Sequence, residues 1–135
     1  MEENKKILII DDDSFLLDMY ALKFGKSEFE VSAALGPEVA LEKLRAGLTP
    51  DVILLDIIMP VMDGFELMEK MKEENLSIKS IRIILSNMGQ PSDVARGEAL
   101  GASGYIVKAS STPTEVIEKV KSIINEHNNL KNGLQ

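Results

Sequence analysis

Five short apolar runs, separated by longer segments with helical spacing, set the pattern of hydrophobic and polar positions along the chain. The runs are rich in β-branched residues, which is typical of strands in a parallel sheet covered on both faces. They predict strands at residues 5–11, 30–34, 51–56, 80–85 and 105–107. The segments between and after them predict helices at residues 14–24, 37–46, 65–73, 91–100 and 113–127. This strict alternation indicates an α/β fold, a three-layer α/β/α sandwich with right-handed crossovers.

Local signals refine three of the predicted helices. The fourth contains Gly97, which lowers helix stability by about 1 kcal/mol relative to alanine, so we expect this helix to be the least stable element. The last should begin with a capping box between Thr112 and Glu115 and with a proline at its first position. The first should turn an apolar face toward the sheet, made of Phe15, Leu16, Met19, Leu22 and Phe24.

Length and composition indicate one ordinary domain. The chain has 135 residues, of which 44% are hydrophobic and 27% charged, as in soluble globular proteins. We assign residues 1–127 to this domain and residues 128–135 to a polar tail. No apolar run approaches the roughly 20 residues of a membrane span. The first six residues carry charges of both signs instead of an apolar signal-peptide core. We therefore expect a cytoplasmic protein without membrane insertion.

Charge and cysteine usage exclude further classes of function. The net charge is −7, whereas non-specific binding to nucleic acid requires a basic surface. Direct binding to nucleic acid is therefore not expected. Cysteine is absent, which excludes disulfide frameworks, thiolate metal sites and thiol catalysis.

Polar residues follow four of the apolar runs, at the point where each run stops. They are Asp11, Asp56, Ser86 and Lys108. In an open α/β sheet, ligands bind beyond the carboxyl ends of the strands, so these side chains should converge on one site. Such a site would combine negatively charged, neutral and positively charged groups.

The acidic residues at this edge predict a metal site. Asp11 and Asp12 end the first run, and Asp56 ends a neighbouring one. Carboxylates a few ångström apart repel each other by about 1 kcal/mol per pair in water, which raises a pKa or recruits a cation. With oxygen ligands alone, Mg²⁺ is the expected ion, and Mn²⁺ could replace it. The alternative is that Asp13 caps the first helix without any metal being involved.

Four motifs resemble those of the receiver domains of two-component response regulators, the CheY-like family. They are residues 9–13 (IIDDD), 54–64 (LLDIIMPVMDG), 83–86 (IILS) and 101–108 (GASGYIVK). Together they extend over nearly the whole chain, and the second is highly specific. The resemblance implies a flavodoxin-like sheet of five parallel strands in the order 2-1-3-4-5.

The resemblance also implies what the site does. Asp56 would accept a phosphoryl group from a phosphohistidine of a sensor histidine kinase or of a histidine phosphotransfer protein. The Mg²⁺ ion would be held by Asp12 and Asp56, by Asp11 through water, and by the backbone carbonyl of Ile58.

Other residues would bind the phosphoryl group and transmit the signal. Ser86, Asn87 and Lys108 would contact phosphoryl oxygens, and Ser86 would act with Tyr105 as the conformational switch. A downstream protein would then read the face formed by the fourth helix, the last strand and the last helix. The implied protein is a monomer that can dimerise when phosphorylated. It would catalyse only its own phosphorylation and dephosphorylation.

The sequence departs from the family pattern near the site. Ala109 follows Lys108, where most receiver domains have proline, often after a cis peptide bond. Ile58 and Met88 are apolar where the family often places groups that orient an attacking water, and Asn87 is larger than the residue usual there. We therefore predict slow self-dephosphorylation, over minutes or longer.

Two other functions are weighed against this one. A phosphatase of the haloacid-dehalogenase type usually needs a second aspartate two residues after its nucleophile, and this chain has Ile58 there. A pseudo-receiver would bind partners without phosphorylation, but the complete set of site residues argues against it. His127, the one histidine, is expected at an exposed helix end and not in a phosphorelay. The chain could also be a fragment of a longer regulator.

Overall fold

A computed structural model describes residues 4–133 and confirms the predicted α/β fold. Five parallel strands form one sheet in the order β2-β1-β3-β4-β5. The strands are β1 (Lys6–Asp11), β2 (Glu30–Leu35), β3 (Val52–Leu55), β4 (Ile81–Ser86) and β5 (Ala102–Val107). The helices are α1 (Ser14–Lys26), α2 (Pro37–Arg45), α3 (Gly64–Glu73), α4 (Pro91–Ala99) and α5 (Pro113–Gly133), with a short 3₁₀ turn at Lys108–Ser110.

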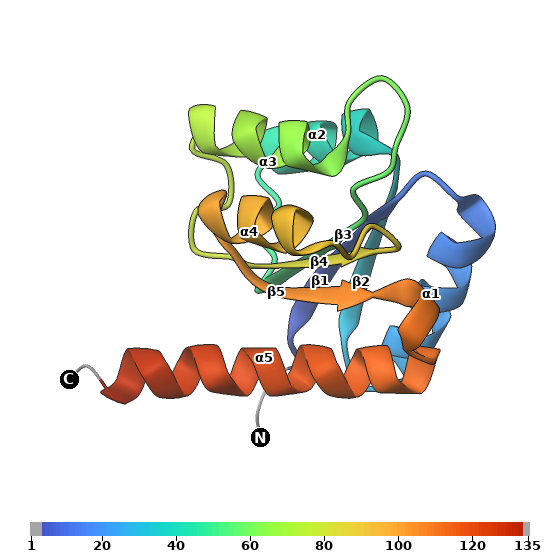
Figure 1. The fold of residues 1–135 in the computed structure, drawn as a ribbon, viewed down its shortest axis with the longest axis vertical. Coiled ribbons are helices and arrows are strands. Elements are labelled where there is room, and N and C mark those ends of the chain that lie inside the picture. Colours follow the sequence, from blue (N-terminus) through green and yellow to red (C-terminus); the bar gives the residue numbers. More distant parts are fainter. Residues whose placement is uncertain (1–3, 134–135) are drawn as a thin grey trace.

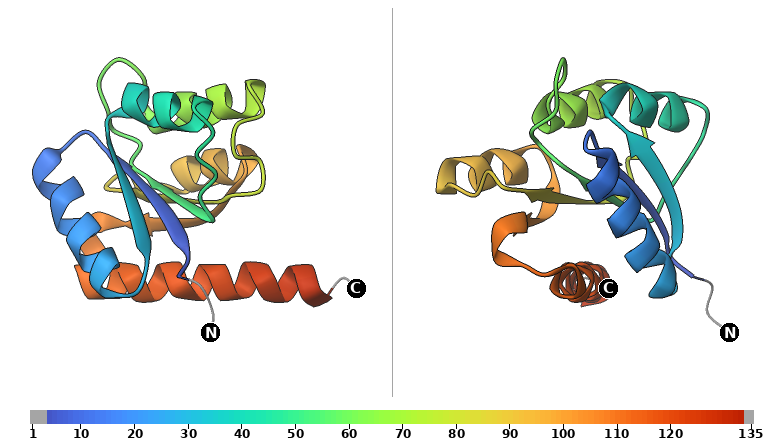
Figure 2. Two further views of the ribbon diagram at one scale, coloured as in Figure 1. Left: turned by 180° about the vertical axis from the view of Figure 1, so that it is seen from behind. Right: turned by 90° about the vertical axis from the view of Figure 1, so that its right-hand side faces the viewer.

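The helices form a layer on each face of the sheet. Figures 1 and 2 show α1 and α5 on one face and α2, α3 and α4 on the other. Alternate residues of each strand supply the two cores. In β1, Ile7 and Ile9 pack toward α1 and α5, whereas Leu8 and Ile10 pack toward α2 and α3. No helix in the described part of the chain is long and apolar enough to cross a membrane.

The predicted inward face of α1 is confirmed only in part. The buried residues are Leu17, Tyr20 and Phe24, whereas Phe15 is 77% exposed and Leu22 is 59% exposed. The helix carries two apolar stripes, and spacing alone does not decide which one faces the sheet. The Asp13 side chain sets where the helix begins, because it accepts hydrogen bonds from the first-turn N–H groups. Only Phe24 of the predicted inward face is fully buried; Leu16 and Met19 are partly buried.

The last helix begins as predicted and ends later than predicted. Thr112 and Glu115 form the expected capping box, with N···O distances of 2.9 and 3.2 Å. The helix continues to Gly133, so residues 128–133, predicted as a polar tail, are helical. Polar residues such as asparagine weaken a helix only slightly, and no proline or glycine stops it before Gly133. Residues 134 and 135 lie outside the described part.

Two further observations concern the start of β5 and the peptide bond between Lys108 and Ala109. β5 begins at Ala102, three residues before its predicted start at Tyr105. Because Gly101 has φ = +102° and ends the turn after α4, pairing with β4 starts directly after it. The Lys108–Ala109 bond is trans, since no cis peptide bond occurs in residues 4–133.

Candidate functional site

The carboxyl ends of β1, β3, β4 and β5 bring the predicted polar residues together. The Asp56 N–H donates to the Ile10 carbonyl at 3.1 Å, which places Asp56 next to the end of β1. Asp11, Asp56 and Ser86 are 3%, 7% and 0% exposed, so all three are buried. A buried polar side chain is costly unless it is paired, which makes their common location informative.

Three carboxylates form the acidic part of the site. One oxygen each of Asp11, Asp12 and Asp56 lie within 4.8 Å of one another. Partial burial and the charges of Asp11 and Asp56 raise the pKa of Asp12 above its ordinary value. The donor set consists of oxygen atoms alone, which suits a small hard cation such as Mg²⁺. Asp12 is exposed, so an ion could keep several water ligands there.

Lys108 supplies the positive charge of the site. Its Nζ lies 2.8 Å from Asp11 Oδ2 and 2.9 Å from Asp56 Oδ2. Burial lowers the pKa of Lys108, but the hydrogen bonds and negative charges of the two aspartates outweigh it and raise the pKa overall. The ammonium group therefore stays charged and bridges the ends of β1 and β3.

The Asp56 carboxylate is held by its own loop as well as by Lys108. Its Oδ1 accepts hydrogen bonds from the N–H groups of Ile57 at 2.7 Å and Ile58 at 3.3 Å. Its Oδ2 faces Lys108. A carboxylate fixed in this way is oriented to act as a nucleophile. The Ile58 side chain is 54% exposed, beside the site.

Gly64 explains part of the motif that follows Asp56. A Cβ atom at Gly64 would lie 2.3 Å from the Asp56 carbonyl oxygen, so only glycine fits the start of α3 here. Asp63 caps the same helix, with its Oδ1 2.8 Å from the Glu66 nitrogen. The motif therefore fixes the loop between β3 and α3 directly after Asp56.

The metal and cap interpretations of the first acidic motif are compatible. Asp13 caps α1, while Asp11 and Asp12 belong to the carboxylate cluster. Asp11 joins the two roles, because its Oδ1 accepts the Asp13 N–H at 3.0 Å. The three consecutive aspartates are thus divided between the helix cap and the carboxylate cluster.

Ser86 and Tyr105 both form hydrogen bonds with the backbone of Met88. The sequence pattern does not predict this role of Met88. The Met88 N–H donates to Ser86 Oγ at 3.3 Å. The Tyr105 hydroxyl donates to the Met88 carbonyl. The tyrosine side chain is therefore turned inward. Asn87 is exposed beside Ser86, and its contact with a phosphoryl group stays a prediction.

Large hydrophobic side chains are exposed around the opening of the site. Val61 is 90% exposed and has φ = +72°, an unfavourable conformation for a β-branched residue. Phe15, at the start of α1, and Ile58 are exposed as well. These three residues form what we call the apolar rim. Such a rim at the mouth of a charged site is typical of a surface that contacts another protein.

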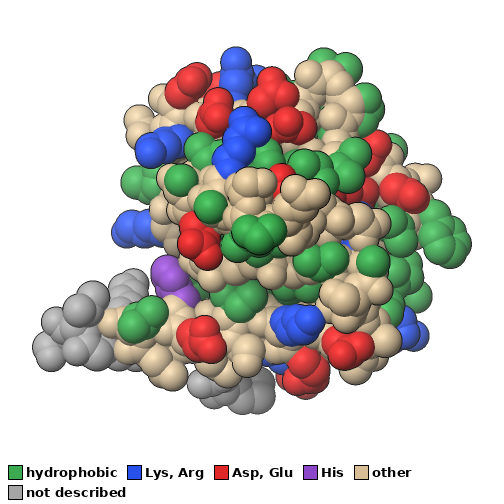
Figure 3. Space-filling view, viewed as in Figure 1, with side chains coloured by type: hydrophobic (Ala, Val, Ile, Leu, Met, Phe, Trp, Pro, Cys, Tyr) green, Lys and Arg blue, Asp and Glu red, His purple; other side chains and the backbone are tan. Residues whose placement is uncertain are grey.

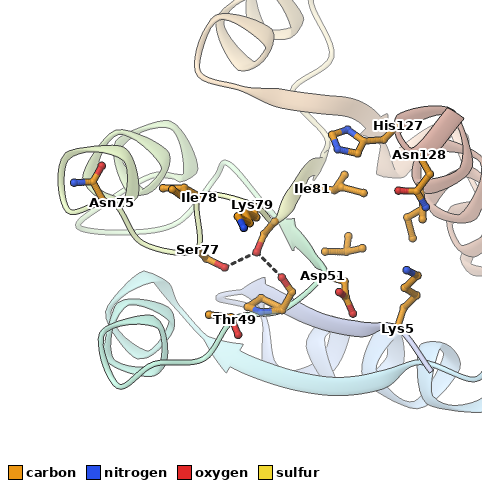
Figure 4. Close-up of a pocket in the computed structure, with 14 residues that line it drawn as sticks. Lys5, Thr49, Asp51, Asn75, Ser77, Ile78, Lys79, Ile81, His127 and Asn128 are labelled. Atoms are coloured by element: carbon orange, nitrogen blue, oxygen red, sulfur yellow. Dashed lines mark hydrogen bonds between the residues drawn. The ribbon is translucent and has the colours of Figure 1, made fainter. Parts of the chain in front are cut away.

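Open hollows lie at the opposite edge of the sheet from the carboxylates. One, of about 700 Å³, is lined by Asp51, Lys79 and His127 among others (Figure 4). Its hydrogen bonds link Ser77 to Ser80 and Ser80 to the Pro50 carbonyl, and they hold loops together. His127 is exposed at its margin, as predicted from its place near the end of the last helix. The chemistry of the molecule is therefore concentrated away from this hollow.

Comparison with known proteins agrees with this geometry. A family model for the response regulator receiver domain matches residues 7–121. The Bacillus subtilis alkaline phosphatase synthesis transcriptional regulatory protein PhoP is 32% identical over 121 residues, which are 90% of this chain and 49% of that protein. The chemotaxis protein CheY of Halobacterium salinarum is 26% identical over 120 residues, which are 89% of this chain and 97% of that protein.

Solved structures show the same similarity. A CheY-like response regulator receiver domain protein from Methanospirillum hungatei superposes with a TM-score of 0.82 at 28% identity, covering 94% of this chain and 98% of that one. The chemotaxis protein CheY4 of Vibrio cholerae gives a TM-score of 0.81 at 27% identity, covering 89% and 98%. Both likenesses extend over the sheet and the site.

Proposed function

The chain belongs to the response regulator receiver domain family, and from this premise we propose that it is a phosphoacceptor switch centred on Asp56. An Asp56 oxygen attacks the phosphorus of a phosphohistidine on a donor protein. The P–N bond breaks, the imidazole leaves, and an acyl phosphate forms on Asp56. The observation that carries the proposal is the Lys108 ammonium, which contacts both Asp11 and Asp56 at hydrogen-bond distance.

The charges of the site support phosphoryl transfer. This reaction depends on an aligned nucleophile and on cations that neutralise the equatorial oxygens of the transferred group. Lys108 can shift from the Asp56 carboxylate to a phosphoryl oxygen without leaving Asp11. The Ser86 hydroxyl accepts a hydrogen bond from Met88, so its own proton is available for another phosphoryl oxygen. Asn87 is proposed as a further donor.

The carboxylates fit a divalent cation. Three carboxylates face one ammonium group, which leaves negative charge uncompensated. We assign the ion to Asp12 and Asp56, to Asp11 through water, and to the backbone carbonyl of Ile58. When bound, Mg²⁺ or Mn²⁺ would neutralise phosphoryl oxygens during transfer.

Protein partners are proposed on both sides of the reaction. The donor would be a sensor histidine kinase or a histidine phosphotransfer protein, and the apolar rim around Asp56 is where it would dock. The readout surface would be the face formed by α4, β5 and α5, and the protein would dimerise through it at most weakly. On the view in Figure 3, Lys and Arg side chains are scattered among Asp and Glu side chains, which favours a protein as reader over nucleic acid.

The chain spans about half the length of the transcriptional regulators that it matches and nearly all of the chemotaxis protein. We propose a cytoplasmic signalling domain whose own chemistry is limited to taking up and slowly losing the phosphoryl group. Ile58 and Met88 offer no polar group to orient an attacking water, which supports slow loss. Ile58 also stands where a haloacid-dehalogenase phosphatase would need its acid, so such turnover is not expected.

Intact mass spectrometry tests the proposal. Incubation with acetyl phosphate and Mg²⁺ should add the mass of one phosphoryl group to the protein, and Asp56→Asn should abolish the gain. Removal of Mg²⁺ by a chelator should suppress it. Label that persists in Asp56→Asn, or a wild-type protein that takes up neither phosphoryl nor beryllofluoride, would contradict the proposal and favour a pseudo-receiver.

A further inference from the structure

Gly97 brings α4 into direct contact with β4 and β5. Of the residues of α4, Gly97 alone is buried. A Cβ atom at this position would lie 2.6 Å from Ile84 Cδ1 and 3.5 Å from Cδ2 of the Tyr105 ring. The absence of a side chain therefore allows α4 to cover the tyrosine ring, and the helix-weakening glycine has a packing role.

A second glycine holds the loop before α4 close to β5. A Cβ atom at Gly89 would lie 2.7 Å from Val107 Cγ2, so a larger residue would push this loop away from the strand. The loop includes Met88, whose N–H is bonded to Ser86 and whose carbonyl accepts the Tyr105 hydroxyl. Gly89 thus keeps Met88 where it joins Ser86 and Tyr105.

The packing decides what would move if Gly97 carried a methyl group. Ile84 is fully buried in a close-packed core, where an added methylene group forces neighbouring atoms to shift. The helix α4 is held more lightly. Its residue Val94 is only half-buried, and the exposed Arg96 lies 4.5 Å from the Phe65 ring centroid and 3.8 Å from Glu69. A methyl group at residue 97 should therefore lift α4 and uncover Tyr105.

We propose that Gly97 and Gly89 act as positioning residues that hold Tyr105 inward in the unphosphorylated protein. The surface formed by α4 and β5 is then preset, and phosphorylation stabilises an arrangement that already exists. A modification shifts an equilibrium only by its different free energy of interaction with the two states, so a preset tyrosine should respond little to it. The proposal concerns the unmodified protein and does not depend on Asp56 being phosphorylated.

Fluorine NMR on protein labelled with 3-fluorotyrosine tests this directly. The chain has two tyrosines, Tyr20 and Tyr105, and Tyr20→Phe assigns the two resonances. In the unmodified wild-type protein, the Tyr105 resonance should show a much smaller H₂O/D₂O solvent isotope shift than it shows in urea-unfolded protein. Addition of Mg²⁺ and beryllofluoride should barely move it. The fluorine signals of bound beryllofluoride report binding in the same spectrum.

The variants separate a role of Gly97 from a general loss of fold. In Gly97→Ala, the Tyr105 resonance should gain solvent isotope shift, and beryllofluoride should then move it toward the wild-type position. Gly25→Ala is the matched control, because a Cβ atom there meets nothing within 4 Å, and its Tyr105 resonance should match wild type. Circular dichroism checks that each variant is folded.

Two results would overturn the inference. One is a solvent-exposed Tyr105 in the unmodified wild-type protein, with a large shift on beryllofluoride binding. The other is a folded Gly97→Ala protein with the wild-type Tyr105 signal. Should Gly97→Ala not fold, the wild-type isotope shift alone decides. Absence of bound beryllofluoride would count against the proposed function and leave this test unaffected.

Discussion

The two strands that precede Asp56 and Lys108, β3 and β5, differ strongly in burial. β3 lies between β1 and β4, and all four of its residues are buried. β5 lies at the edge of the sheet, and of its six residues only Ile106 is buried. Asp56 follows β3, and Lys108 follows β5. The core therefore fixes the position of Asp56. Tyr105 lies in an edge strand that can adjust, and Lys108 directly follows that strand.

The largest expected effect tests the difference in packing itself. Leu54→Ala in β3 should lower the free energy of unfolding by about 2–5 kcal/mol, because the side chain is 1% exposed. Val107→Ala in β5 should lower it by only about 1 kcal/mol, since this residue is partly open to solvent. Urea denaturation followed by circular dichroism measures both, and equal losses would contradict the comparison.

The next prediction removes the contact between the two strand ends. Without metal, Lys108→Met should lower the free energy of unfolding by about 2–3 kcal/mol, because Asp11 and Asp56 stay buried without their cation. Mg²⁺ should recover much of this loss, since a divalent ion can balance the same carboxylates. Urea titrations with Mg²⁺ and with a chelator measure the effect.

The control for this variant is Lys119→Met, which removes an exposed lysine from α5. It should change neither the stability nor the response to Mg²⁺. A Lys108→Met protein that is as stable as wild type in the presence of chelator would show that the ion pair does not hold the two ends together.

Asp12→Asn should raise the free energy of unfolding, by less than Lys108→Met lowers it. The raised pKa of Asp12 means that its ionised form is less favourable in the folded protein than in the unfolded chain. Near neutral pH and without metal, the variant should therefore be slightly more stable, by about half a kcal/mol at most, because solvent screens the charge of this exposed side chain. It should also lose most of the stabilisation that Mg²⁺ gives to wild type.

Thermal unfolding with and without Mg²⁺ checks this prediction. Asp18→Asn on the exposed side of α1 serves as the control and should leave the Mg²⁺ response unchanged. Full retention of Mg²⁺ stabilisation in Asp12→Asn would remove this residue from the metal site.

The smallest expected effect concerns strain in the loop after β3. Val61→Gly should raise the free energy of unfolding by roughly half a kcal/mol. Relief of the left-handed conformation, about 1–2 kcal/mol, is partly offset by the roughly 0.5–1 kcal/mol that glycine costs in chain entropy. Phosphoryl uptake from acetyl phosphate should not change. A clear loss of stability would mean that Val61 makes a contact within the chain that offsets its strain.

The same contrast explains what could be predicted from the sequence. The five strands and the common location of Asp56 and Lys108 follow from buried apolar runs that end in polar residues, whereas the strand order was implied by the resemblance to receiver domains. The inward face of α1 was predicted only in part because spacing does not choose between two apolar stripes, and packing against the sheet buries Leu17, Tyr20 and Phe24. The contacts of Tyr105 with Gly97 and with the Met88 carbonyl could not be predicted, because these residues meet the tyrosine only in the folded molecule.

Because α5 is long, a small movement of β5 would displace the far end of this helix by a larger distance. A Cβ atom at Gly104 of β5 would lie 2.4 Å from Ile123 Cδ1, so strand and helix touch closely there. Beyond this contact the helix projects past the sheet (Figure 1). The part of α5 from Ile123 to Gly133 is about 15 Å long, at 1.5 Å per residue, so a tilt of the helix at Ile123 would displace its far end most. A slight tilt at β5 is thereby magnified at the far tip.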